Sequence, residues 1–115
     1  MPLLKLETTV AIPEEKRKAL LAELSGIMAQ TTGKPEEYVM VTASAVTMLM
    51  SGKGGDAAFV DVRGIGGLEG DVNRKLSEKI CQALNRSLGI LPKRVYLNFT
   101  EVDAGNWGWD GKTFA

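Results

Sequence analysis

The sequence predicts an α+β fold in which two repeated β-α-β units form a four-stranded mixed sheet with two helices on one face. Segments that alternate apolar and polar residues are separated by segments whose apolar residues recur at three- and four-residue steps. Each helical segment ends in a glycine, and a proline follows soon after it. The chain has 115 residues and 44% hydrophobic content, so we expect a single domain over residues 1–115.

The first unit begins with a strand, because apolar and polar residues alternate from Leu4 to Thr9. A helix is predicted over Pro13–Thr32. Its apolar stripe comprises Leu20, Leu21, Leu24, Ile27 and Met28. Gly33 and Pro35 end this helix, and Tyr38–Val46 is the second predicted strand.

The second unit repeats this order of elements. Ala57–Val62 is predicted as a strand, and the glycine-rich loop Gly64–Gly70 leads from it into a second amphipathic helix. The apolar stripe of that helix comprises Val72, Leu76, Ile80, Leu84 and Leu88. Gly89 and Pro92 end it, and Arg94–Val102 is the fourth predicted strand.

The two units are most alike after their helices, where Pro35–Val41 and Pro92–Asn98 are expected to occupy equivalent places. Right-handed crossovers put both helices on one face, so the other face of the sheet stays uncovered. The polar residues expected on that face are Lys5, Glu7, Asp61, Tyr96 and Asn98. A polar and apolar mixture of this kind suits a self-associated barrel or ring with partly wet walls, so we expect a homo-oligomer.

Composition excludes several classes of function. Fourteen basic residues balance fourteen acidic ones, so neither nucleic acid nor a membrane is an expected partner. Cys81 is the only cysteine and histidine is absent, which argues against a metal site and against Cys/His or Ser/His catalysis. With no signal peptide or membrane-spanning run in the sequence, we expect a cytoplasmic protein.

Pro2 is the candidate catalytic residue. A small residue at this position usually allows removal of the initiator methionine, which would leave the secondary amine of Pro2 as the N-terminus. A free α-amino group titrates near ~8, and burial in an apolar pocket lowers its pKa towards the range of a general base. From the dipeptide alone, the alternative is that Pro2 only protects the terminus or begins an edge strand.

Three further motifs occur with Pro2, in order along the chain. They are Thr32-Gly33-Lys34-Pro35, Arg94-Val95-Tyr96-Leu97-Asn98-Phe99 and Gly108-Trp109-Asp110-Gly111-Lys112-Thr113-Phe114-Ala115. With them, the sequence from Pro2 to Ala115 resembles the macrophage migration inhibitory factor family. The resemblance implies a homotrimer whose sheets form a central barrel, with active sites at subunit interfaces and no cofactor. It also implies keto-enol tautomerase activity on enolisable 2-keto acids such as phenylpyruvate, and release from cells without a signal peptide.

The resemblance assigns roles to individual residues. Pro2 would transfer the proton, and Lys34 would bind the substrate carboxylate with help from the backbone N–H of Ile65. Without the resemblance, Lys34 is simply a cation placed near a helix C-terminus. The other expected substrate contacts are Tyr96 and Asn98 from a neighbouring subunit, and Trp107, Trp109 and Phe114 as pocket walls. A C-terminal staple is an equally good account of Trp109.

The sequence departs from the family pattern at two places. The founding member has a Cys-x-x-Cys pair where this chain has Asp56–Val60, so its thiol redox activity should be missing here. Trp107 stands where the founding member has a smaller aliphatic residue, and the indole would either narrow the cleft or swing out and enlarge it.

Three other functions remain as alternatives. Gly64–Glu69 resembles a dinucleotide-binding loop, but Glu69 stands at its third glycine position and would repel a pyrophosphate. A cytokine-like binding protein with a vestigial pocket is the second alternative. The third is a hydratase, decarboxylase or dehalogenase, which would need an arginine beside Pro2. Arg63 and Arg94 are the candidates, and both are expected to be solvated charges at strand ends.

Overall fold

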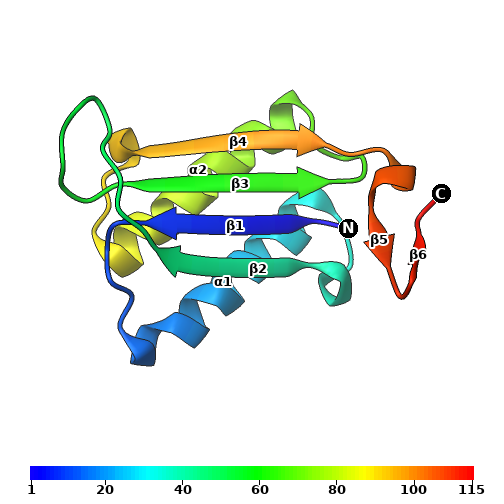
Figure 1. Ribbon diagram of the computed structural model, residues 1–115, viewed down its shortest axis with the longest axis horizontal. Coiled ribbons are helices and arrows are strands. Elements are labelled where there is room, and N and C mark those ends of the chain that lie inside the picture. The colour runs from blue at the N-terminus through cyan, green and yellow to red at the C-terminus, as the bar shows by residue number, and fades with distance from the viewer.

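The computed structural model describes residues 1–115, which form one four-stranded sheet backed by two helices (Figure 1). The elements of the two units are β1 (Leu3–Thr8), α1 (Glu14–Thr32) and β2 (Met40–Ala45), then β3 (Ala58–Gly64), α2 (Gly70–Leu88) and β4 (Val95–Glu101). The strand order is β2-β1-β3-β4. Strands within a unit are parallel, whereas β1 and β3 are antiparallel, so the predicted mixed sheet is confirmed.

Both helices end where the glycines predict. Gly33 and Gly89 have φ angles of 74° and 71°, which are left-handed values that favour glycine. Their N–H groups donate to the carbonyls of Ala29 and Asn85, at 2.9 Å in each case. These bonds satisfy carbonyls of the last helical turn and turn the chain back towards the sheet.

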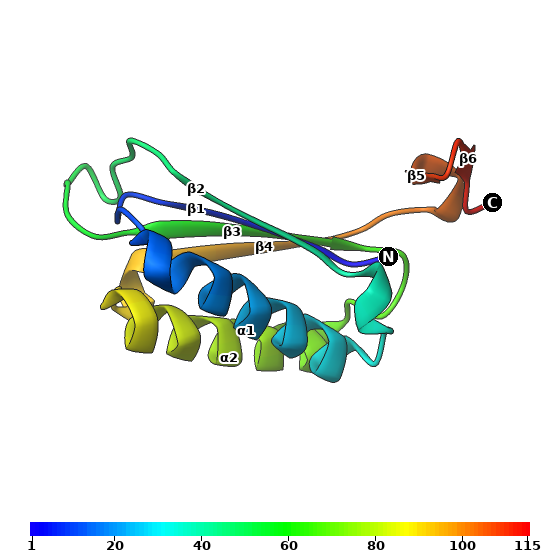
Figure 2. The ribbon, with the colours of Figure 1, turned by 90° about the horizontal axis from the view of Figure 1, so that it is seen from below.

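The hydrophobic core lies between the helices and one face of the sheet (Figure 2). Fully buried side chains come from the central strands β1 and β3 and from both helices, and they include Leu4, Leu6, Leu24, Met28, Val60, Val62, Leu76, Ile80 and Leu84. The packing between the helices and the sheet therefore uses the apolar stripes that the sequence predicts. Neither helix is long and apolar enough to cross a membrane.

The expected equivalence of Pro35 and Pro92 is wrong by one residue. Each helix is followed by a short 3₁₀ helix, η1 over Glu36–Tyr38 and η2 over Pro92–Arg94. Pro92 is the first residue of its 3₁₀ helix, whereas Pro35 precedes one, because proline is tolerated in both places. Tyr38, which lies outside β2, is therefore the counterpart of Arg94.

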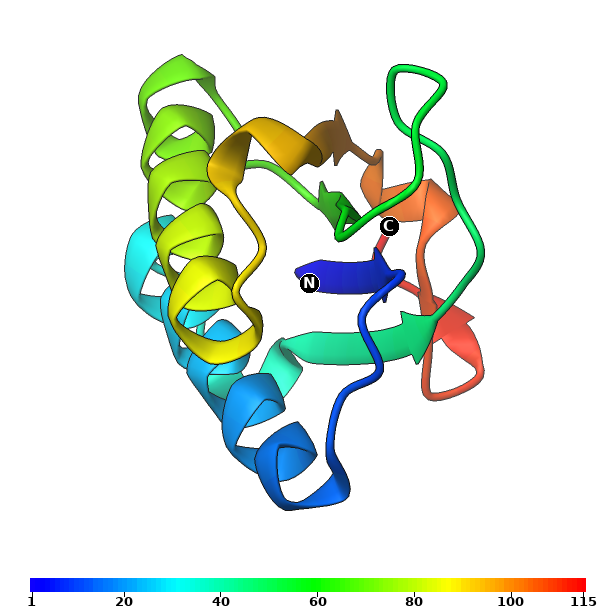
Figure 3. The ribbon, with the colours of Figure 1, turned by 90° about the vertical axis from the view of Figure 1, so that its left-hand side faces the viewer.

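The open face of the sheet carries the loop after β2 and the C-terminal segment (Figure 3). That segment contains a 3₁₀ helix, η3 (Ala104–Asn106), and a hairpin of β5 (Gly108–Trp109) and β6 (Lys112–Thr113). The hairpin lies beside the N-terminus, on the side of the sheet opposite the helices (Figures 1 and 2).

Candidate functional site

A cavity of about 250 Å³ lies where the N-terminus, the start of β2 and the C-terminal hairpin meet. Its lining residues are Met1, Pro2, Leu3, Glu37, Tyr38, Val39, Met40, Trp107, Gly108, Trp109 and Phe114. The parallel pairing of β1 with β2 places Leu3 beside Met40, and the N–H of Met40 donates to the Pro2 carbonyl at 3.0 Å. We call this the first cavity.

Pro2 is buried in the wall of the first cavity, and Met1 lies half-buried beside it. The pKa of the Met1 amine is lowered from its ordinary value of 8.0, mainly by burial and also by the charge of Lys34. An N-terminal amine at this end of the sheet is therefore shifted towards its neutral, basic form.

Lys34 reaches the same region from the other side. It follows Gly33 at the end of α1, is half-buried, and donates from Nζ to the carbonyl of Ile65 at 3.2 Å. Gly67 lies beside this side chain, since a Cβ atom there would be in van der Waals contact with Lys34 Cε at 3.4 Å. The structure thus brings Lys34 and Ile65 together, through the Ile65 carbonyl and not its N–H. Neither residue lines the first cavity while Met1 is in place.

The C-terminal hairpin supplies an aromatic wall. The rings of Trp109 and Phe114 are stacked with centroids 5.9 Å apart, and Tyr38 meets Trp109 edge-on at 6.3 Å. The N–H of Phe114 donates to the carbonyl of Trp107 at 3.2 Å, which holds the end of the chain against the segment before β5. This hairpin therefore both staples the C-terminus and lines the cavity.

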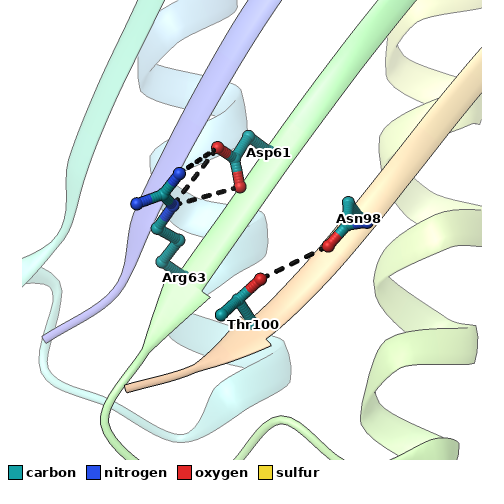
Figure 4. A network of polar contacts seen from close by, with 4 residues as sticks. All are labelled: Asp61, Arg63, Asn98 and Thr100. Atoms are coloured by element: carbon teal, nitrogen blue, oxygen red, sulfur yellow. Dashed lines mark hydrogen bonds and ion pairs between the residues drawn. The ribbon is translucent and has the colours of Figure 1, made fainter. Parts of the chain in front are cut away.

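Tyr96 and Asn98 lie apart from the first cavity, on the open face of β4. Tyr96 is 66% exposed. Asn98 pairs in register with Asp61, and its Oδ1 accepts a hydrogen bond from Thr100 Oγ1 at 3.3 Å (Figure 4). Within one chain, these two side chains contribute nothing to the cavity around Pro2.

Comparison with known proteins identifies the family. Residues 1–115 match the family model of macrophage migration inhibitory factor (MIF). The chain belongs to the MIF family. It is 37% identical over 119 residues to macrophage migration inhibitory factor of Mus musculus, with the whole of both chains covered. A second curated relative, the MIF of Xenopus tropicalis, is 35% identical over 84% of each chain.

Solved structures of MIF homologues share the fold. The homologue from Prochlorococcus marinus superposes with a TM-score of 0.93 at 37% identity, covering 98% of this chain and 99% of its own. The MIF-like protein from Entamoeba histolytica gives a TM-score of 0.94 at 34% identity, covering 98% of each chain. The resemblance and the fold class predicted from the sequence are therefore confirmed.

The sequence did not indicate the wall formed by residues 37–40. Glu37, Tyr38, Val39 and Met40 line the first cavity because β2 begins level with Leu3, the residue after Pro2, in the β1–β2 ladder. Tyr38 was predicted to begin the second strand, and that position did not indicate a contact between its ring and Trp109. Parallel pairing between β1 and β2 was the available signal, since it brings the residues just before β2 to the N-terminus.

The two arginines considered as partners of Pro2 have other contacts. Arg63 is ion-paired with Asp61 at 3.0 Å on the open face (Figure 4). Arg94 is only half-exposed, and its guanidinium donates to the carbonyls of four residues, Met50, Lys53, Gly54 and Asp56. The expectation that Arg94 is a solvated charge is wrong, because the loop after β2 folds back over it.

Proposed function

We propose that this MIF-family chain is a keto-enol tautomerase of phenylpyruvate-like 2-keto acids, with the amine of Pro2 as its general base. The observation that carries the proposal is the burial of Pro2 in the wall of an aromatic cavity at the N-terminus. The charge of Lys34 acts on the amine at that terminus, as its effect on the Met1 pKa indicates. Membership of the MIF family supports the same chemistry.

The base requires removal of Met1. While Met1 is attached, the Pro2 nitrogen belongs to a peptide bond and has no basic lone pair. Removal also takes the Met1 side chain out of the first cavity. Burial is the main cause that lowers the pKa of the Met1 amine, which supports a lowered pKa for an amine at this terminus.

The reaction transfers one proton and needs no co-reactant. The neutral Pro2 nitrogen takes a proton from C3 of the keto acid, and the C–H electron pair becomes the C2=C3 double bond. The carbonyl π pair moves onto oxygen, which takes the proton from the Pro2 ammonium to give the enol and leaves the nitrogen neutral. In the reverse direction the nitrogen takes the hydroxyl proton and delivers it to C3. The ammonium of Lys34 has three donors, so it can hold the substrate carboxylate beside Ile65, whose N–H is a further proposed donor.

The remaining proposed contacts come from two places. Trp107, Trp109 and Phe114 would surround the substrate ring, as their positions in the cavity wall allow. Tyr96 and Asn98 would arrive from a neighbouring subunit of a homotrimer, since both are exposed on the open face of a single chain. The active site would then be complete only at a subunit interface.

The test is the rate of phenylpyruvate ketonisation with the processed protein and with Pro2→Gly, which keeps a terminal amine but loses the ring. We expect kcat/KM to fall about 10²- to 10⁴-fold, the usual contribution of a general base. Intact mass confirms removal of Met1, and light scattering checks the trimer. Equal activity of the two folded proteins would contradict the proposed role of Pro2.

A cytokine-like binding function is the second candidate, favoured by the names of the vertebrate relatives. Such a protein would present its surface to a partner and retain the pocket without using it. Pro2→Gly separates the two functions, because partner binding would survive the substitution whereas tautomerase activity would not.

A further inference from the structure

A second cavity of about 310 Å³ lies directly beside the first. It is lined by Leu3, Arg63, Val102, Asn106, Trp107 and Gly108. Leu3, Trp107 and Gly108 line both cavities, and Gly108 has no side chain. The half-buried Trp107 is therefore the largest side chain in the shared wall.

The backbone of Trp107 is held on both sides. Its N–H donates to the carbonyl of Ala104 at 3.4 Å, and its own carbonyl accepts the N–H of Phe114 at 3.2 Å. The next residue, Gly108, lies close to the facing strand of the hairpin, since a Cβ atom there would be in van der Waals contact with the Lys112 carbonyl oxygen at 3.4 Å. The indole thus stands on a fixed segment, and shortening this side chain is expected to open the wall without moving the chain.

The two cavities differ in chemistry. The first is walled by aromatic rings, whereas the second contains the Arg63 guanidinium and the Asn106 amide. Arg63 uses Nε and Nη2 to bind Asp61, at 3.0 to 3.3 Å, which leaves donors on Nη1 unused by that pair (Figure 4). A molecule that extended from the first cavity into the second would pass from apolar to hydrogen-bonding surroundings.

The size of the first cavity also matters. It measures about 250 Å³ with Met1 among its lining residues, and Trp107 lines it on the side that it shares with the second cavity. An extended molecule would need the space behind the indole.

We propose that Trp107 determines specificity by closing the first cavity against the second, which restricts the site to single-ring 2-keto acids. Replacing the indole with a small side chain joins the cavities and admits extended substrates whose far end carries a carboxylate for Arg63. This inference rests on the proposed function for its substrate class. It differs from that function in making a claim about binding that does not depend on catalysis.

The test compares two acids that cannot enolise, 3-phenylpropanoate and 3-(4′-carboxybiphenyl-4-yl)propanoate, by isothermal titration of the processed protein. We expect wild type to bind the extended acid at least 10-fold more weakly than the short one. In Trp107→Val, the ratio should shift at least 10-fold in favour of the extended acid. Trp107→Leu repeats the measurement if the valine variant folds poorly.

Two further variants control for general loosening of the site. Met40→Ala shortens a side chain that lines only the first cavity and lies on β2, not on the C-terminal hairpin, so it should not favour the extended acid. Arg63→Gln in the Trp107→Val protein should remove the gain in affinity for the dicarboxylate. It should spare the gain in affinity for 3-(biphenyl-4-yl)propanoate, which lacks the far carboxylate. An unchanged ratio in Trp107→Val, or no binding of either acid, overturns the proposal. Because neither acid reacts, a wrong assignment of the Pro2 base would not alter these results.

Discussion

The two β-α-β units have the same order of elements, and each has a 3₁₀ helix after its α-helix. These equivalent 3₁₀ helices lie at opposite ends of the sheet and carry different side chains (Figure 1). Tyr38 closes the 3₁₀ helix of the first unit and packs on the C-terminal hairpin, whereas Arg94 closes that of the second and hydrogen-bonds the loop after β2. One end of the sheet therefore carries the first cavity. At the other end the Arg94 guanidinium binds the carbonyls of Met50, Lys53, Gly54 and Asp56, and we call this cluster the polar seal.

The residues after the helices differ in the same way. Lys34 follows Gly33 and is half-buried with an ammonium that reaches Ile65, whereas Ile90 follows Gly89 and is fully buried. At the position after the helix-ending glycine, a charge is thus accommodated in the first unit only. The comparison teaches that the candidate site occupies the end where the repeat has exchanged core packing for polar and aromatic groups.

Exchanging these two residues should have the largest effect on stability. Ile90→Lys places an ammonium where the wild-type side chain has no exposed surface, which should lower the free energy of unfolding by on the order of 3 kcal/mol or more. Lys34→Ile should change it by no more than about 1 kcal/mol while lowering the proposed tautomerase activity. Urea denaturation measures both, and equal losses in the two variants would show that the ends are not different.

The polar seal should be sensitive to the shape of its cation. Arg94→Lys keeps the charge but loses the planar fork that spans carbonyls from Met50 to Asp56, so we expect a loss of about 1–2 kcal/mol. Proteolysis within Gly52–Gly55 should also become faster. Tyr38→Phe is the matched control, because its contact with Trp109 is made by the ring that phenylalanine keeps. An Arg94→Lys protein as stable as wild type would contradict the seal.

The smallest expected effect concerns protonation of the N-terminal amine. In the chain that retains Met1, the pKa of the Met1 amine is lowered by burial and by Lys34, so the folded chain binds fewer protons than the unfolded chain between the lowered pKa and 8.0. The free energy of unfolding should therefore rise with pH across this window. Lys34→Met removes the repulsion, so it should raise the amine pKa and flatten that rise.

NMR titration of the N-terminal amine and melting curves at several pH values check this prediction. Lys5→Met, on the open face of β1, is the control for loss of a positive charge elsewhere. An amine pKa that stays the same in Lys34→Met would leave burial as its only cause.

The sequence predicted the regular elements well, because their signals are local. Alternation and helical stripes marked the strands and helices, and Gly33 and Gly89 marked both helix ends. The short strands β5 and β6 were not predicted, since two-residue strands have no periodicity to detect. The aromatic residues of this segment were predicted as pocket walls, with a C-terminal staple as the alternative for Trp109, but nothing in the sequence indicated a hairpin.

The walls of the site depend on register and contacts between distant segments, which local patterns do not specify. Tyr38 joins the cavity through strand pairing and Arg94 becomes bonded through loop closure. Pro2, Trp107, Trp109 and Phe114 line one cavity, whereas Tyr96 and Asn98 do not join them within one chain. Their proposed roles depend on contacts between subunits.

The C-terminal hairpin sets how the cavity opens. Its strands are two residues long and exposed, and its turn places Asp110 and Gly111 at φ angles of 54° and 74°. A two-stranded hairpin has little stability of its own, so the ring contacts of Trp109 hold it in place. Amide protons of the hairpin should therefore exchange through local opening, well before those of β1 and β3. A ligand bound between the rings and Pro2 would couple the hairpin to the sheet, so that occupancy would be measurable as slower exchange at the end of the chain.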